Sequence, residues 1–422
     1  FLPCGGADFG ATLPLPVTGY RMPADSRPRR RFTAALTVAL TSLIAGCTQN
    51  PNSVFHSRTE FNREVDGLFQ LMIWLGTAVF IFTEVLLVYA LWRFRHKPGT
   101  PRQPEQVHGN TRLEILWTVI PAVVLAMIAV PTVRVIFATQ AEAPPNALQV
   151  EVIGHQWWWE FRYPQYGFTT ANEVYMPIGR PVNFHLKTND VIHSFWIPAL
   201  GGKRDLVNNR TNYLWFTPDS TTEAAFNGFC AEYCGTSHAN MRFKAFAVTP
   251  EQFESWAANQ AMPAAISSRP PAAGAPAVQP VQAGYVGFPR ANMPAYAMPQ
   301  TPIPPSLAID TTLVGDASRG AQLVARGTCA LCHTVRGEPS LVAKIGPDLT
   351  HVGGRLTIGG GLYPNDRPHL PAWIKNAPML KPGSLMPAQG AGQYDAVTKT
   401  VLGIGLNDQQ IADVVAYLQA LK

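Results

Sequence analysis

The sequence predicts a multidomain membrane protein, with a hairpin of two membrane-spanning helices, a β domain and a C-terminal module that ends in a helix. Two long apolar runs, at 67–92 and 113–137, predict the hairpin, and alternating apolar and polar residues over 148–250 predict the strands. The chain has 422 residues, enough for two or three domains, and a net charge of +6. Only 14% of its residues are charged, against about a quarter in average proteins, which also favours a membrane component.

The beginning of the chain is typical of an export signal. Residues 1–21 have no pattern, the first methionine is Met22, and arginines at 27–31 precede an apolar run at 32–45. The run ends in Leu-Ile-Ala-Gly-Cys at 43–47, which is similar to a bacterial lipoprotein box. We therefore expect translation to start at Met22 and the mature chain to start at a lipidated Cys47, without Cys4. An uncleaved signal, or an ordinary Cys47, is the alternative.

Both apolar runs are long enough to cross a hydrocarbon core of about 30 Å as helices. Glu84 interrupts the first run, and a carboxylate at that depth either has a function or is hydrogen-bonded or protonated against a partner helix; we favour the second reading. The second run contains Pro121 and Pro131, which spanning helices tolerate. The loop between the runs is basic, with Arg93, Arg95, Lys97, Arg102 and Arg112, so we expect it in the cytoplasm and both outer ends on the opposite side.

Three consecutive tryptophans, Trp157 to Trp159, lie in the predicted β domain. Successive side chains on a strand point to opposite faces, so at least one of these rings must point away from the core. An exposed tryptophan indicates an interface. Packing of all three rings near a partner subunit or the membrane is the alternative. We expect His155 and His185, in the same region, to be structural.

Four side chains that bind soft metal ions lie close together at 228–241, and His193 is a fifth candidate upstream. Thiolate, imidazole and thioether ligands together select copper over hard cations. Two thiolates can bridge two metal ions, so the pattern predicts a dinuclear copper site. A disulfide, or a site for one zinc or copper ion, is the alternative. The four clustered residues are Cys230, Cys234, His238 and Met241.

A second cofactor motif follows a stretch at 259–306 that is rich in Ala, Pro, Gln and Gly. Such a composition buries little apolar surface, so we interpret it as a linker that tethers two modules at high effective concentration. Cys329, Cys332 and His333 form a Cys-x-x-Cys-His motif, which attaches haem c through two thioethers and one iron ligand. We choose Met386 as the sixth iron ligand. Its rivals are Met379, His351 and His369.

These motifs together resemble the cytochrome c oxidase subunit II family, in the bacterial caa3-type form with a cytochrome c domain fused at the C-terminus. The resemblance covers about residues 55–422 and includes the aromatic segment at 154–160 and Gly-Pro-Asp-Leu at 346–349. It implies a cupredoxin-like β-barrel or sandwich and an all-α class I cytochrome c domain. Asn208 and Asn209 replace the family's Pro-Gly, and Phe229 replaces a common Gln, but neither departure removes a ligand.

The resemblance also implies roles for single residues. Trp157 would be the point at which electrons reach the copper site, called CuA in this family. Glu114, otherwise a surface carboxylate at a helix N-terminus, would lie at the mouth of a proton pathway into subunit I. The Glu232 carboxylate would bind a magnesium ion shared with subunit I. The CuA ligands would be His193, Cys230, Glu232 through its carbonyl, Cys234, His238 and Met241.

The function implied is electron transfer without a catalytic centre in this chain. Electrons would pass from an external cytochrome or other donor to haem c, to CuA and to haem in subunit I, where oxygen is reduced to water and protons are pumped. The partners implied are subunits I and III and the membrane lipid, with no nucleic acid. The location implied is a bacterial inner membrane, with both cofactor domains on the periplasmic side.

Three rival functions have different consequences. A quinol oxidase subunit would lack the copper ligands. A CuA-containing nitric oxide reductase subunit and a freestanding membrane-tethered electron carrier remain, and two spans with Glu114 favour an assembled subunit over the carrier. We expect five parts: an upstream stretch and signal at 1–46, the hairpin at 47–140, the CuA domain at 141–258, the linker at 259–308 and the cytochrome c domain at 309–422.

Overall fold

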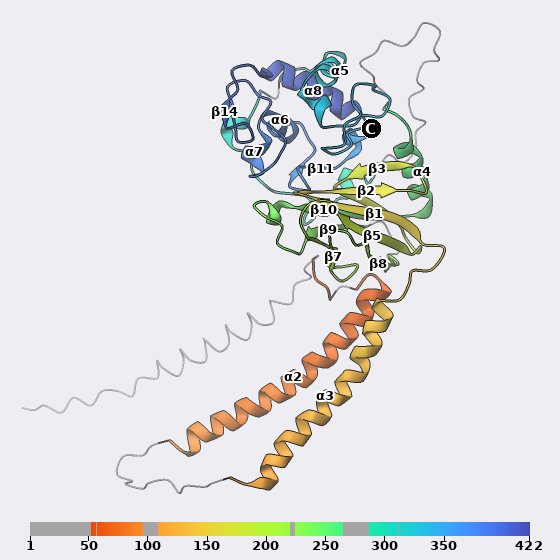
Figure 1. Cartoon of the computed structure of the whole chain (residues 1–422). Coiled ribbons are helices and arrows are strands. Elements are labelled where there is room, and N and C mark those ends of the chain that lie inside the picture. The colour runs from red at the N-terminus through yellow and green to blue at the C-terminus, as the bar shows by residue number, and fades with distance from the viewer. Residues whose placement is uncertain (1–51, 56, 96–108, 220–223, 265–286, 311) are drawn as a thin grey trace, which may run out of the picture. The chain divides into compact units, whose positions relative to one another are not determined.

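Two long apolar helices open the described part of the chain (Figure 1). The computed structural model describes residues 52–55, 57–95, 109–219, 224–264, 287–310 and 312–422. Helix α2 spans Glu60–Arg93 and helix α3 spans Thr111–Thr139, so both predicted spans lie inside helices. Both helices are long and apolar enough to cross a membrane, and Pro121 and Pro131 lie within α3. The predicted signal, Cys47 and most of the basic loop fall outside the described residues.

Polar contacts fasten the start of α2 to the β domain. Thr59 caps the helix by accepting a hydrogen bond from the Asn62 N–H, and its hydroxyl donates to the Leu200 carbonyl at 2.5 Å. Asn62 Nδ2 donates to the Pro198 carbonyl at 2.8 Å. The Glu60 carboxylate accepts a hydrogen bond from the Thr217 N–H of the β domain at 3.0 Å. The membrane helix is therefore hydrogen-bonded directly to the domain that it carries.

The β domain consists of two five-stranded sheets, in the orders β3-β2-β1-β5-β8 and β4-β10-β9-β6-β7. Neighbouring strands are antiparallel except for β1 with β5 and β4 with β10. This is the cupredoxin-like fold, as predicted. The strands are β1 (Leu148–His155), β2 (Trp158–Tyr163), β3 (Phe168–Ala171), β4 (Glu173–Pro177), β5 (Val182–Thr188), β6 (His193–Trp196), β7 (Arg204–Leu206), β8 (Asn212–Phe216), β9 (Ala224–Cys230) and β10 (Arg242–Val248).

Aromatic rings from both sheets form the core between them. Trp159 of β2 contacts Phe243 of β10 with ring centroids 5.4 Å apart, and Phe195 of β6 stacks on Phe243 at 4.9 Å. All three side chains are fully buried. Strand β5 alternates buried and half-buried residues along its whole length, which is the period-two pattern that predicts a strand. Helix α4 (Pro250–Ala261) closes one end, where Trp256 stacks on Tyr175 at 4.2 Å.

The C-terminal domain is helical, as predicted, with two short two-stranded ladders. Helix α5 packs on α8, where a Cβ on Gly320 would lie 2.0 Å from the Asp413 carbonyl oxygen, so only glycine allows this approach. Asn407 and Gln410 form the predicted capping box of α8. The elements are α5 (Ala317–Arg326), α6 (His369–Lys375), α7 (Ala377–Leu380), α8 (Asp408–Ala420), β11 (Thr357–Ile358), β12 (Tyr363–Pro364), β13 (Tyr394–Asp395) and β14 (Thr400–Val401).

The predicted linker differs from the structure in its second half. Residues 287–308 are packed, because Phe288 stacks on Phe246 of the β domain at 5.0 Å and its N–H donates to the Tyr175 hydroxyl at 3.0 Å. Ala297 and Leu307 are fully buried. The expectation that this composition stays without packed structure is wrong for 287–308, since Phe288 and Ala297 pack into the core of the β domain and Leu307 packs into the core of the C-terminal domain. The first residues assigned to the linker, 259–261, belong to α4.

Candidate metal centre and haem pocket

The copper motif closes into one cluster at the ends of β6 and β9, in which His238 is half-buried and the other four side chains are buried. His193 begins β6, Cys230 ends β9, and the loop to β10 carries the other three side chains. The Cys230 Sγ lies 3.8 Å from His193 Nδ1 and 3.7 Å from Cys234 Sγ. The Cys234 Sγ lies 3.7 Å from His238 Nδ1 and 3.8 Å from Met241 Sδ. Each sulfur therefore has its own imidazole, and all five predicted side chains meet.

Backbone hydrogen bonds hold the loop in this shape. The Cys230 N–H donates to the Met241 carbonyl at 3.0 Å, which joins the two ends of the loop. The Ala231 N–H donates to the Ser194 carbonyl at 2.9 Å, which ties the loop to β6. These bonds bring the Glu232 carbonyl within 3.2 Å of the Cys230 Sγ, although residue 232 is otherwise exposed. One residue thus offers a carbonyl to the buried cluster and a carboxylate to the surface.

Asp190 orients the buried imidazole of His193. The His193 Nε2 donates to Asp190 Oδ1 at 2.8 Å, so Nδ1 keeps its lone pair toward the sulfurs. Burial would raise the pKa of Asp190, but hydrogen bonds from His193 and from the Gln156 N–H lower it below its ordinary value. The carboxylate therefore stays ionised and fixes the ring. Asp190 was not predicted from the sequence, although an acidic residue three positions before a candidate ligand is a usable signal.

The two thiols lie close enough together to bind the same metal ions. Their sulfurs are 3.7 Å apart and both cysteines are free. The hydrogen bond between them lowers the pKa of Cys230 and raises that of Cys234. Metal binding to such a pair releases the remaining proton. Two thiols, two imidazoles, a thioether and a carbonyl fit copper, whereas a four-ligand zinc site would leave donors unused.

The three tryptophans have three different environments. Trp159 is buried in the core, and Trp158 stacks on His155 at 4.2 Å. Trp157 is half-buried, and its Nε1 donates to the Cys234 carbonyl at 3.0 Å. Trp157 also lines a cavity of the C-terminal domain. The prediction that at least one ring points away from the core agrees with these positions.

That cavity brings the haem motif and Met386 together. It is lined by Cys329, Cys332, His333 and Met386, with mostly apolar residues between them. The His333 Nδ1 donates to the Pro347 carbonyl at 2.8 Å, which leaves Nε2 as the metal-binding nitrogen. A Cβ on Gly346 would lie 2.7 Å from His333 Cε1, so glycine makes room for the ring. Two thiols, an unprotonated imidazole nitrogen and a thioether around an apolar cavity fit haem c.

The rival iron ligands lie elsewhere. Met379 is 51% exposed and is absent from the lining of the cavity, as are both rival histidines. The His351 Nε2 bonds to the Met262 carbonyl at 3.0 Å, and His369 Nδ1 pairs with Asp366 at 2.5 Å. Among the described residues, Met386 is thus the candidate that faces the same space as the haem motif.

The remaining candidates lie at the edges of the described chain. Glu114 lies in the first turn of α3, which Asn110 caps, next to the undescribed loop. His155 pairs with Glu160 at 2.9 Å, and His185 bonds to Gln149 at 2.7 Å, so both have structural partners. These contacts agree with the structural roles expected for the two histidines.

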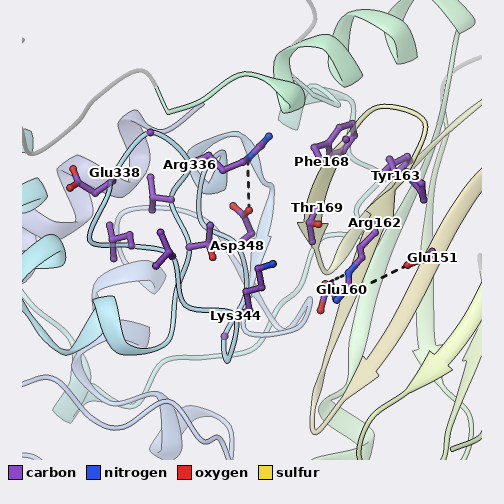
Figure 2. A pocket seen from close by; sticks show the side chains of 18 of the residues that line it. Glu151, Glu160, Arg162, Tyr163, Phe168, Thr169, Arg336, Glu338, Lys344 and Asp348 are labelled. Atoms are coloured by element: carbon purple, nitrogen blue, oxygen red, sulfur yellow. Dashed lines mark hydrogen bonds and ion pairs between the residues drawn. The ribbon is translucent and has the colours of Figure 1, made fainter. Parts of the chain in front are cut away.

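A cleft of about 990 Å³ separates β2 and β3 from the segment at 334–348 of the C-terminal domain. Figure 2 shows Arg336 paired with Asp348 on one wall, and Arg162 with Glu151 and Glu160 on the other. These ion pairs lie within each wall rather than across the cleft. They therefore neutralise charge locally and do not join the two domains.

Comparisons with known proteins assign each part of the chain. The transmembrane domain of cytochrome c oxidase subunit II matches residues 54–135, its periplasmic domain matches 168–248, and cytochrome c matches 317–422. Cytochrome c oxidase subunit 2 of Alkalihalophilus pseudofirmus is 33% identical over 360 residues, 84% of this chain and 86% of the relative. The subunit 2 of Bacillus subtilis is 30% identical over 353 residues, 80% of this chain and 83% of the relative.

Among solved structures, the periplasmic domain of cytochrome oxidase subunit II of Bradyrhizobium japonicum is 30% identical, with a TM-score of 0.27. That match covers 28% of this chain and 96% of the solved one. Because relatives at 30% identity or more are covered over most of their length, the chain belongs to the cytochrome c oxidase subunit II family, in the form that carries a C-terminal cytochrome c domain.

Proposed function

We propose that electrons enter a haem–copper oxidase through this chain, from haem c to a dinuclear CuA centre and then to haem in subunit I, where oxygen is reduced to water and protons are pumped. The observation that carries this assignment is the position of Trp157. Its indole bonds to the Cys234 carbonyl at 3.0 Å, and its ring also lines the cavity of the haem motif. When bound, copper and haem iron each supply one-electron redox chemistry; the protein supplies ligands, burial and orientation.

The ligand assignment follows from the donor set. His193, Cys230, Cys234, His238 and Met241 would hold copper with their side chains. The backbone carbonyl of Glu232 would complete that site. Asp190 would keep the His193 ring in its ligating orientation, because the carboxylate accepts its distal N–H at 2.8 Å.

The haem c site would be held by three groups of the motif and one distant methionine. Cys329 and Cys332 would form the thioethers, and His333 and Met386 would be the protein's ligands to the iron. The Pro347 carbonyl fixes the His333 ring at 2.8 Å, so its Nε2 is free to bind metal. A thioether ligand raises the potential of the iron relative to a second histidine.

Three further assignments concern the surroundings of the sites. The exposed Glu232 carboxylate would bind magnesium at the contact with subunit I, because a hard cation takes oxygen ligands. Glu114 would lie at the entrance of a proton pathway into subunit I. Cys47 would carry a lipid. The chain would lie in a bacterial inner membrane, with 47–140 as anchor and 141–258 and 309–422 as periplasmic cofactor domains, and subunit III and an external electron donor would complete its partners.

The test is purification of the chain with its partner subunits, followed by measurement of gas consumption with a reduced cytochrome as donor. We expect oxygen uptake, haem c that resists acid-acetone extraction, and copper bound in addition to the copper of subunit I. Consumption of nitric oxide without oxygen uptake would contradict the oxidase function. Purification without any partner subunit would favour a freestanding electron carrier instead.

A further inference from the structure

The two cofactor domains touch in two contact areas, and the first contact area is centred on a buried carboxylate. Glu173 begins β4, the edge strand of its sheet, and is only 1% exposed. Its Oε1 accepts three hydrogen bonds from the cytochrome c domain: the Leu356 N–H at 2.8 Å, the Thr357 N–H at 2.9 Å and the Thr357 hydroxyl at 3.0 Å. Leu356 is buried in the core cluster of the β domain. An edge strand that would otherwise face solvent is thus covered by the other domain.

The second contact area lies beside the copper loop. Lys381 follows α7, is 4% exposed, and donates through Nζ to the Trp157 carbonyl at 2.5 Å and the Gly359 carbonyl at 3.0 Å. The next residue is also bonded, because the Ser237 hydroxyl donates to the Pro382 carbonyl at 2.5 Å. A Cβ on residue 383 would lie 2.7 Å from the Trp157 ring, so glycine permits this contact. The loop that presents Met386 to the haem cavity is therefore hydrogen-bonded to Trp157 through Lys381, which lies five residues before Met386.

The packed part of the predicted linker adds hydrogen bonds to the first contact area. Arg290 donates through Nη2 to the Leu356 carbonyl at 3.3 Å and to the Asn365 carbonyl at 2.8 Å. Phe288, two residues earlier, is anchored on the β domain. The segment thus clamps the same turn that Glu173 holds, and the contact is fixed from two sides.

Burying a carboxyl or an ammonium group costs free energy unless its hydrogen-bond partners are in place. Each group therefore favours the arrangement of the two domains that supplies those partners over other arrangements. A tether alone raises the concentration of one domain near the other but does not orient it. Electron transfer over a fixed path requires orientation as well.

We infer that Glu173 and Lys381 are positioning residues, which hold the cytochrome c domain in one docked arrangement with its haem cavity against Trp157. The inference rests on the proposed function for the roles of the two cofactor sites. It adds that electrons pass within a docked chain, rather than during encounters of a freely tethered domain.

The test uses the assembled oxidase and four variants: Glu173→Ala, Glu173→Gln, Lys381→Met and, as a matched control, Lys344→Met. Lys344 is exposed on the cleft of Figure 2 and belongs to neither of the two contact areas. The first readout is amide hydrogen exchange at Leu356 and Thr357, which needs neither cofactor. The second is the rate of electron passage from haem to copper after rapid reduction of the haem.

We expect Glu173→Ala to raise exchange at both amides by roughly tenfold or more, because it removes the shared acceptor. Electron passage should slow several-fold, with the haem and copper spectra unchanged. At pH 5, Glu173→Gln should behave much as the unaltered protein does, because the amide oxygen replaces Oε1. Lys381→Met should slow electron passage, since it keeps the apolar stem but loses both bonds, and Lys344→Met should change neither readout.

Unchanged exchange and electron passage in Glu173→Ala would overturn the inference. Equal effects of the Ala and Gln variants would also overturn it, because the acceptor oxygen would then be irrelevant. Protected amides in a complex that consumes no oxygen would refute the proposed function and leave the docking intact, so the two failures are distinguishable.

Discussion

Docking of the two domains should weaken as the pH rises from 5 to 6.5. Burial raises the pKa of Glu173 to about 7 from an ordinary value of 4.5, although bonds from Thr357 and Leu356 and the charge of Arg355 oppose this. Lys244, paired with Glu173 across β4 and β10, is the other charge that faces it. When the domains separate, the carboxyl faces solvent and its pKa returns toward 4.5.

The sign follows from proton binding. The docked form holds a proton on Glu173 up to about pH 7, whereas the separated form releases it near 4.5. Docking is therefore fully stabilised below pH 4.5, and this stabilisation is lost as the pH rises through 7. The difference between the two pKa values corresponds to about 3 kcal/mol, an upper figure because Lys244 still attracts the carboxylate in the separated form. Between pH 5 and 6.5 it predicts a roughly twentyfold fall in the docking equilibrium.

The assay is amide exchange at Leu356 and Thr357, divided by the intrinsic exchange rate at each pH. The pH range stops at 6.5 because burial lowers the pKa of Lys381 to about 7 and that of Lys244 to about 8, and these groups act with the opposite sign at higher pH. Glu173→Gln is the matched control, since it resembles the protonated carboxyl and cannot titrate. A protection ratio that is constant with pH, or one that varies equally in Glu173→Gln, would refute this reasoning.

Four further outcomes are expected. Cys230→Ser should abolish the dinuclear copper signal and leave the haem spectrum intact; loss of both would contradict separate cofactor domains. Met386→Ala should change the ligation of the haem iron in its absorption spectrum, whereas Met379→Ala should not. Asp190→Ala should weaken copper binding about 10- to 100-fold in a chelator competition, since the buried imidazole loses its orienting partner. Trp159→Ala should destabilise the β domain by about 3–5 kcal/mol in denaturant unfolding, because it empties the centre of the aromatic core.

The copper site could be predicted from the sequence because most of it lies on one short loop. Cys230, Cys234, His238 and Met241 fall within 228–241, so chain geometry alone keeps their side chains close. His193 is far away in sequence, so spacing does not bring it to this loop; it was a candidate because imidazole binds copper, and the family resemblance then gave it a ligand role. Asp190 was missed, since an acidic residue in a turn is more often solvated than bonded to a ligand.

The hairpin and the strands were predictable for a related reason: each depends on a local period or on length. Residues 67–92 are long enough to span a membrane, and β5 alternates residue by residue. The packed segment at 287–308 has neither property. Its order comes from Phe288 and Arg290, whose partners belong to two different domains.

Local sequence patterns do not predict contacts between domains, because neither domain's sequence shows which of its side chains the other domain will bury. Glu173 begins a strand of mainly apolar residues, where alternation predicts a solvent-facing carboxylate, yet it is among the most buried acids of the described chain. Lys381 follows a short helix in a loop, where a lysine is ordinarily exposed. Each becomes buried only because the other domain supplies a backbone partner: the Leu356 N–H for the acid and the Trp157 carbonyl for the base. Since a backbone partner carries no side-chain signature, the three-dimensional structure is required to find it, and variants of Glu173 and Lys381 are required to weigh it.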